Sequence, residues 1–229
     1  MSDTMIVVGD TPVLDDVPVL LEGRVLNLPE GAVRNPDGSV TLTLVAPKLF
    51  RYSDRGQLQE STLETLLLHR LNGVDIAKMR AAKDPTNTAL VQSLRWSAAK
   101  FELLLKVLDA RDLGRAEEVV GEFLDMSAAG GLPPHAEETA EGVMLPMMEH
   151  PAEDAAGTAH DSFLFKWLTA AQVRQIKDAP DPLAWAVALA TGLSPKGAKE
   201  VLASMDGADA MAMSRVVSFL RGAGRRTGG

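Results

Sequence analysis

The sequence predicts a mainly α-helical protein with an N-terminal β-hairpin module, an α+β chain in which an acidic linker joins two similar small helical subdomains. Three observations predict this fold class. The first sixty residues are rich in Val and Leu with partial alternation around a turn. Two later segments resemble each other at a constant offset of 97 positions. Residues typical of helix starts recur at matching positions in both segments.

The β module is predicted from two Val- and Leu-rich stretches, residues 17–28 and 40–45. Between them lie residues 35–38 (Asn-Pro-Asp-Gly), in which proline presets φ and glycine tolerates a positive φ. These features predict a hairpin. Because an isolated hairpin is marginally stable in water, we expect it to pack on the segment that follows.

The internal repeat is seen when the sequence is shifted by 97 positions. Twelve residues then meet identical ones without a gap: Leu67, Leu71, Ala82, Asp84, Pro85, Ala89, Ser97, Leu105, Asp109, Asp112, Val119 and Val120. We interpret this as a duplication. The predicted divisions are 1–60 (β module), 61–126 (first helical repeat), 127–160 (acidic linker with Gly and Pro), 161–222 (second helical repeat) and 223–229 (flexible basic tail).

Helix starts explain the most conspicuous aspartates. Asp84 and Asp181 each precede a proline, the arrangement of an N-cap followed by a first helical residue that needs no N–H. We therefore expect both, and likewise Asp112, within one residue of a helix start. The second copy contains a Thr-Gly-Leu-Ser break at 191–194, whereas the first lacks this glycine and is expected to run as one helix over 86–107.

Two further aspartate pairs, at 109 and 112 and at 206 and 209, also have helix-start spacing: the first residue can cap and the second falls in the first turn. The alternative reading is calcium. A calcium loop needs alternating oxygen ligands and a closing Glu, but Ala-Met-Ala-Met follows Asp209. We therefore expect no metal at these pairs.

The linker is predicted from composition. Residues 116–165 contain eleven Asp and Glu but no Lys or Arg, with Gly-Gly and Pro-Pro pairs. An apolar island, residues 142–148 (Gly-Val-Met-Leu-Pro-Met-Met), docks either back onto the chain or onto a partner, and self-docking is favoured because exposed Met is a liability. Met211 and Met213 cannot share a helix face, since two positions span about 200°. We expect a partner helix to displace the island from this region. The predicted partner-binding residues are Met144, Leu145, Met147, Met148, Met211 and Met213.

Several kinds of chemistry have no support in the sequence. The chain lacks cysteine, its four histidines have no metal-ligand spacing, and no nucleophile elbow or phosphate loop occurs. Net charge of −8 and acidic helix starts argue against nucleic acid, including a helix-turn-helix mode. No signal peptide is expected, and the longest apolar run, 183–190, is too short for a membrane span. We expect no enzyme activity and no cofactor.

The repeat motifs resemble the tail assembly chaperones of long-tailed bacteriophages, of the type found in Mu-like phages. The second copy matches at 190–194 (Ala-Thr-Gly-Leu-Ser), 202–209 (Leu-Ala-Ser-Met-Asp-Gly-Ala-Asp) and 216–220 (Val-Val-Ser-Phe-Leu). The first copy matches at 105–112 (Leu-Lys-Val-Leu-Asp-Ala-Arg-Asp) and 119–124 (Val-Val-Gly-Glu-Phe-Leu). Members of this family are usually short and single-copy, whereas this chain is doubled behind a β module.

The resemblance implies a non-catalytic protein of the host cytoplasm that binds the tape-measure protein during tail assembly and is absent from the mature virion. Tail tube protein and further copies of the chain are additional candidate partners. The Met-rich stripes suit a helical partner, because Met side chains adapt to varied apolar surfaces. The alternative is a structural tail or baseplate adaptor that stays in the virion.

Overall fold

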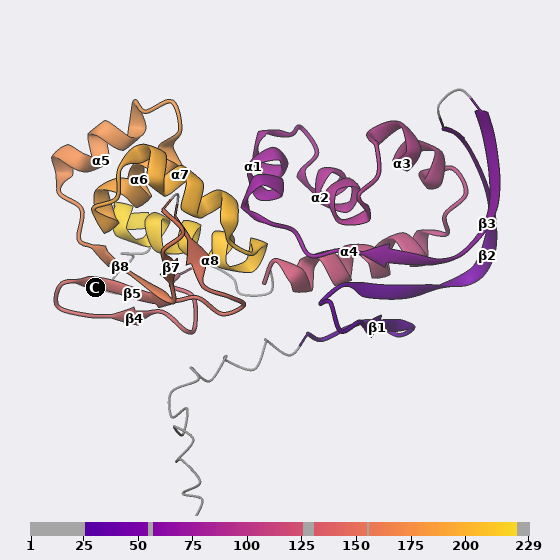
Figure 1. Ribbon diagram of the computed structural model, residues 1–229, viewed down its shortest axis with the longest axis horizontal. Helices are drawn as coiled ribbons and strands as arrows, with labels where there is room; N and C mark the ends of the chain where they lie inside the picture. Colours follow the sequence, from indigo (N-terminus) through magenta and orange to yellow (C-terminus); the bar gives the residue numbers. More distant parts are fainter. Residues whose placement is uncertain (1–25, 55–56, 126–130, 155, 224–229) are drawn as a thin grey trace, which may run out of the picture.

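The computed structural model describes residues 26–54, 57–125, 131–154 and 156–223. It shows a mixed α+β protein that is mainly helical, as predicted. Two units lie side by side in Figure 1, the first in indigo to pink and the second in orange to yellow. Each unit consists of a small antiparallel sheet and four α-helices.

The first unit contains a three-stranded sheet in the order β1-β2-β3. Its elements are β1 (Ala32–Arg34), β2 (Val40–Asp54), β3 (Gln57–Leu68), α1 (Gly73–Ala81), α2 (Pro85–Leu94), α3 (Ala98–Leu105) and α4 (Ala110–Phe123). Helices α2 and α4 contact β3, and α4 also packs along β2. The sheet therefore has one covered face and one face toward solvent.

The second unit repeats this plan with a sheet in the order β4-β5-β8. Its elements are β4 (Glu137–Glu138), β5 (Gly142–Pro146), β8 (Ser162–Lys166), α5 (Ala170–Lys177), α6 (Pro182–Thr191), α7 (Pro195–Ser204) and α8 (Gly207–Ser218). A two-stranded ribbon, β6 (Ala152–Glu153) and β7 (Ala159–His160), interrupts it, and a π-helical turn, η1 (Phe219–Ala223), follows α8.

The helix starts agree with the predicted offset of 97. Helices α5, α6, α7 and α8 each begin 97 positions after α1, α2, α3 and α4. The N-caps correspond as well, and each accepts a hydrogen bond from a backbone N–H of the first turn; the pairs are Asn72 and Thr169, Asp84 and Asp181, Ser97 and Ser194, and Asp109 and Asp206.

The duplication also includes the sheets, of which the sequence comparison reached only the last strand, where Leu67 meets Leu164. Val40 pairs with Leu68 in the first sheet, and Val143 pairs with Phe165, which lies 97 positions after Leu68. All four side chains are fully buried. Each repeat is therefore a three-stranded meander followed by four helices.

Much of the segment expected to be an acidic linker forms the sheet of the second repeat. Within residues 131–154 and 156–160 the chain forms β4, β5, β6 and β7, and Val143 and Leu145 are fully buried. The strands are only two to five residues long. Their turns supply most of the Gly, Pro and acidic residues, so composition alone mistook a short-stranded sheet for a linker.

The N-terminal module also differs in its strands. Residues 17–25 of the first expected strand lie outside the described residues, 26–28 are not in a strand, and β1 begins at Ala32. The predicted turn is confirmed, since Gly38 N donates to Asn35 O at 3.0 Å with a φ of +81° at Gly38. Strand β3 continues to Leu68, into the region assigned to the first helical repeat.

The single helix expected over 86–107 is wrong, because the chain breaks at Arg95. This residue takes the left-handed conformation, φ 56°, at the position that Gly192 occupies in the second repeat with φ 83°. A side chain costs free energy in this conformation. The Arg95 guanidinium compensates by donating to Asp75 Oδ2 at 2.8 Å and to Arg70 O at 2.9 Å.

A long hairpin arm formed by residues 48–54 and 57–63 of β2 and β3 distinguishes the first repeat. It starts beyond an irregularity between Thr43 and Lys48 and curves past α3 (Figure 1). Phe50 stacks on Trp96 with ring centroids 5.5 Å apart, and Lys100 Nζ lies 4.1 Å above the Trp96 ring. These contacts hold the arm against α3.

Candidate partner-binding site

The predicted partner-binding residues lie on β5, on the loop after it and on α8. Three of them are buried and three are half-buried. The buried side chains are Leu145, Met147 and Met213, and the half-buried ones are Met144, Met148 and Met211. The different burial of Met211 and Met213 agrees with the helix geometry expected from their spacing. Only the half-buried three can contact a partner without opening the fold.

The apolar island is not a detachable cover. Its first five residues form β5, the central strand of the second sheet, between β4 and β8. Displacing it would expose Val143 and Leu145, both fully buried, and would break the pairing with β8. The displacement mechanism expected from the sequence therefore requires the sheet to unfold, which is far more costly than exchanging one surface strip for another.

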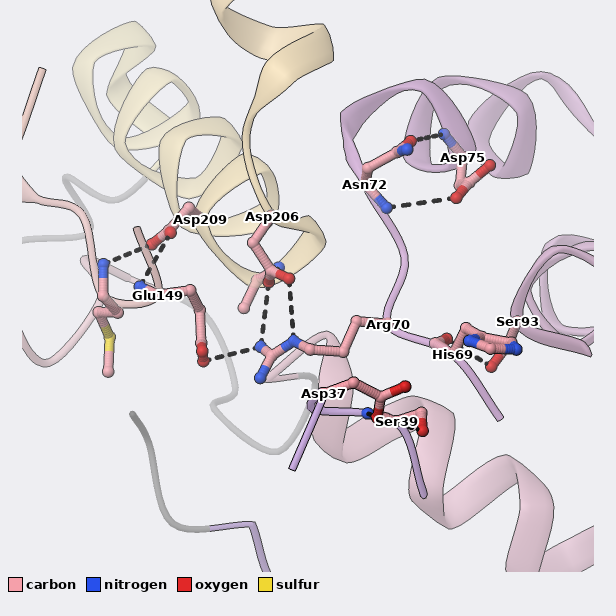
Figure 2. Close-up of polar contacts among 12 residues, drawn as sticks. Asp37, Ser39, His69, Arg70, Asn72, Asp75, Ser93, Glu149, Asp206 and Asp209 are labelled. Carbon is pink, nitrogen blue, oxygen red and sulfur yellow. Dashed lines mark hydrogen bonds and ion pairs between the residues drawn. The ribbon is translucent and has the colours of Figure 1, made fainter. Parts of the chain in front are cut away.

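The two repeats meet at a buried ionic cluster around Arg70 (Figure 2). Arg70 follows β3 and lies opposite the N-terminus of α8. Its Nε and Nη2 donate to Asp206 Oδ2 and Oδ1 at 2.9 and 3.1 Å, and Nη2 lies 2.7 Å from Glu149 Oε1. The three side chains are 13%, 4% and 5% exposed. Bidentate pairing in a buried setting makes Arg70 the main electrostatic link between the repeats.

Backbone hydrogen bonds complete this junction. Gly73 N donates to Met205 O at 3.1 Å, and Gly207 N donates to Leu71 O at 2.7 Å. Both positions require glycine: a Cβ at 73 would lie 1.5 Å from Leu202 O, and one at 207 would lie 2.8 Å from Leu71 O. The equivalent positions 170 and 110 carry alanine. The starts of α4 and α5, which hold the equivalent positions, therefore lack the glycines on which this contact depends.

Asp209 and Asp112 occupy equivalent positions but have different electrostatic environments. Asp112 Oδ1 accepts from Val45 N at 3.0 Å and forms an ion pair with Arg115. Asp209 Oδ1 accepts from Met148 N at 2.9 Å, but the position equivalent to Arg115 is Ala212. Among the described residues Asp209 has no ion pair.

Burial raises the pKa of Asp209 to about 6, even though the N–H groups of Met148 and Glu149 stabilise its charged form. The negative charges of Asp206 and Glu149 raise it further. The junction thus contains one arginine and three carboxylates. At neutral pH the charged carboxylate of Asp209 therefore destabilises the folded state.

The helix-start interpretation of the aspartates is confirmed in most cases. Asp84 and Asp181 are N-caps, and Asp206 caps α8 by accepting from Ala208 N at 2.8 Å. The expectation for Asp112 is wrong: it is the third residue of α4, and Asp109 is the cap. Sequence reasoning missed that Asp206 also binds Arg70, because the two residues are 136 positions apart and no local pattern joins them.

No group of three or more potential metal ligands occurs among the described residues. His160 Nε2 lies 3.2 Å from Asp154 Oδ2, which is a local contact within the β6–β7 ribbon. In the part of the chain that the structure describes, no helix combines the length and the apolar character of a membrane span. Comparison with protein-family models, curated proteins and solved structures gave no match.

Proposed function

We propose that this chain is a non-catalytic tail assembly chaperone that binds the tape-measure protein in the host cytoplasm before the tail is complete. One observation carries the proposal. The motifs on which the resemblance depends occupy equivalent places in both repeats. Residues 105–112 form the turn from α3 to α4, and 202–209 form the turn from α7 to α8. The Val-Val pairs lie buried on α4 and α8.

These motif residues build the fold, so partner binding has to use other surfaces. Large exposed apolar side chains among the described residues all belong to the first repeat: Val33, Val45, Leu49, Leu67, Val74 and Val107. Val33 and Leu67 both pair with Thr41, on neighbouring strands of one sheet. The second repeat adds half-buried Met144, Met148 and Met211. Such a dispersed apolar surface suits transient binding of a long helical partner better than it suits a compact ligand.

The test is co-expression with the tape-measure protein encoded in the same genome, followed by size-exclusion chromatography. We expect co-elution and improved tape-measure solubility, and no complex with the tape-measure protein of an unrelated phage. Mass spectrometry of purified virions separates the two functional classes. A chaperone is absent from them, whereas stoichiometric presence would reject the proposal in favour of a tail or baseplate adaptor.

A further inference from the structure

A groove runs along the seam between the repeats, where α1 of the first repeat faces α6, α7 and α8 of the second. Its main hollow has a volume of about 690 Å³ and is joined by a second of about 180 Å³ that shares Ala77 and Leu183 with it. Small or apolar side chains form much of the lining, including Ala81, Val217 and the exposed Val74. We call these two hollows the seam groove.

Three cations from different elements surround the seam groove: Arg80 on α1, Lys199 on α7 and Arg221 after α8. None of them forms an ion pair with a described residue, and Arg80 donates instead to the Ser214 hydroxyl. The one carboxylate in the lining, Asp181, accepts from Ala184 N as the cap of α6. The groove is therefore cationic in a chain of net charge −8.

Elsewhere in this fold, many arginines pair with carboxylates. Six arginines have carboxylate partners among the described residues: Arg51, Arg70, Arg95, Arg111, Arg115 and Arg215. At the same seam, the Arg70 guanidinium is compensated twice, by Asp206 and Glu149. The seam groove thus concentrates uncompensated positive charge beside an apolar floor.

We propose that the seam groove binds an acidic amphipathic segment of a protein partner. The apolar side of the segment lies on the Ala- and Val-containing floor, and its Asp and Glu residues meet Arg80, Lys199 and Arg221. The inference rests on the proposed function in that the tape-measure protein would supply this segment. Charge complementarity selects the acidic class, and the apolar floor favours a peptide over a nucleic acid, whose backbone would leave that floor uncovered.

The direct test uses fluorescence anisotropy with a labelled helical peptide of about four turns. The probe carries an apolar strip flanked by Glu, and matched peptides replace Glu by Gln or by Lys. We expect the Glu peptide to bind and the others to bind at least tenfold more weakly, with an affinity that falls as salt rises. Failure of the Glu peptide to bind, or equal binding of the Gln peptide, would overturn the proposal.

Arg80→Gln, Lys199→Gln and Arg221→Gln in one chain remove the three groove charges. Lys106→Gln, Lys166→Gln and Arg174→Gln remove three exposed charges elsewhere and serve as the control. We expect about tenfold weaker peptide binding for the groove variant and no change for the control. Circular dichroism and thermal unfolding verify that both variants fold. Equal loss in both variants, or competition by single-stranded DNA as effective as by the Glu peptide, would show general polyanion binding instead.

Two outcomes separate this inference from the proposed function. If the Glu peptide binds through the groove charges but no tape-measure complex forms, the groove proposal is supported and the proposed chaperone function is rejected. If the groove variant forms the tape-measure complex as well as the parent does, the chaperone function is supported and the groove proposal is overturned.

Discussion

Substituting Asp209→Asn removes a buried carboxylate that has no ion pair, while keeping the side chain's size and one oxygen acceptor for Met148 N. The pKa of Asp209 is about 6 in the folded protein, against the ordinary value of 3.8. The difference of about two units corresponds to about 3 kcal/mol. Between pH 4 and 6 the folded state binds more protons than the unfolded state does. The contribution of Asp209 to the free energy of unfolding is therefore most favourable below about pH 4. It becomes less favourable as the pH rises through 6.

In the variant this particular pH dependence disappears. Asn also loses the acceptor that receives Glu149 N at 3.3 Å, which we expect to cost about 1 kcal/mol. The variant should accordingly be about 1–2 kcal/mol more stable than the parent at pH 7 and slightly less stable at pH 4. Because other carboxylates titrate alike in both proteins, their effect cancels when the free energy of unfolding of the parent is subtracted from that of the variant.

The assay is urea unfolding of both proteins at intervals between pH 4 and 8. Asp112→Asn at the equivalent position of the first repeat is the matched control. There the carboxylate pairs with Arg115, so the substitution leaves a partly buried guanidinium with only neutral acceptors, among them Glu30 O and Thr43 O, and should destabilise by about 3 kcal/mol at pH 7. If the stability of Asp209→Asn runs parallel to that of the parent across this range, or if both variants lose stability alike at pH 7, the electrostatic reasoning is refuted.

Three further substitutions test the fold. Gly73→Ala places a Cβ 1.5 Å from Leu202 O, so unfolding measurements should show a loss of several kcal/mol in stability. Ala170→Gly at the equivalent helix start should lower stability by no more than about 1 kcal/mol. Similar losses in the two variants would contradict the close contact. Asp84→Ala and Asp181→Ala should each lower stability by about 1 kcal/mol, and no change in thermal unfolding would argue against capping. Trp96→Ala removes the stacking partner of Phe50 and should make the arm more susceptible to limited proteolysis while α5 to α8 stay protected; an unchanged cleavage pattern would show that other contacts hold the arm.

Local patterns were sufficient for much of the helical architecture. An Asp before a Pro, or a Ser three positions before the amide that it caps, acts within one turn, and so the sequence carries the signal for α2, α6 and α7 in adjacent residues. The offset of 97 appeared because both repeats kept these signals. The turn at residues 35–38 was equally predictable, since Pro fixes its own φ and Gly tolerates the positive φ that the turn needs.

The sequence by itself thus determined where α2, α4, α6, α7 and α8 begin, and it indicated that the unit is doubled. Only the tertiary structure decided the role of residues 142–148, because a five-residue strand is defined by its neighbours on either side. Only the structure joined Arg70 to Asp206 across 136 positions, where ion pairing depends on the packing of one repeat against the other. It also distinguished Asp112 from Asp209: both occupy the same position of a helix, but the nearby cation and the degree of desolvation are properties of the folded surroundings.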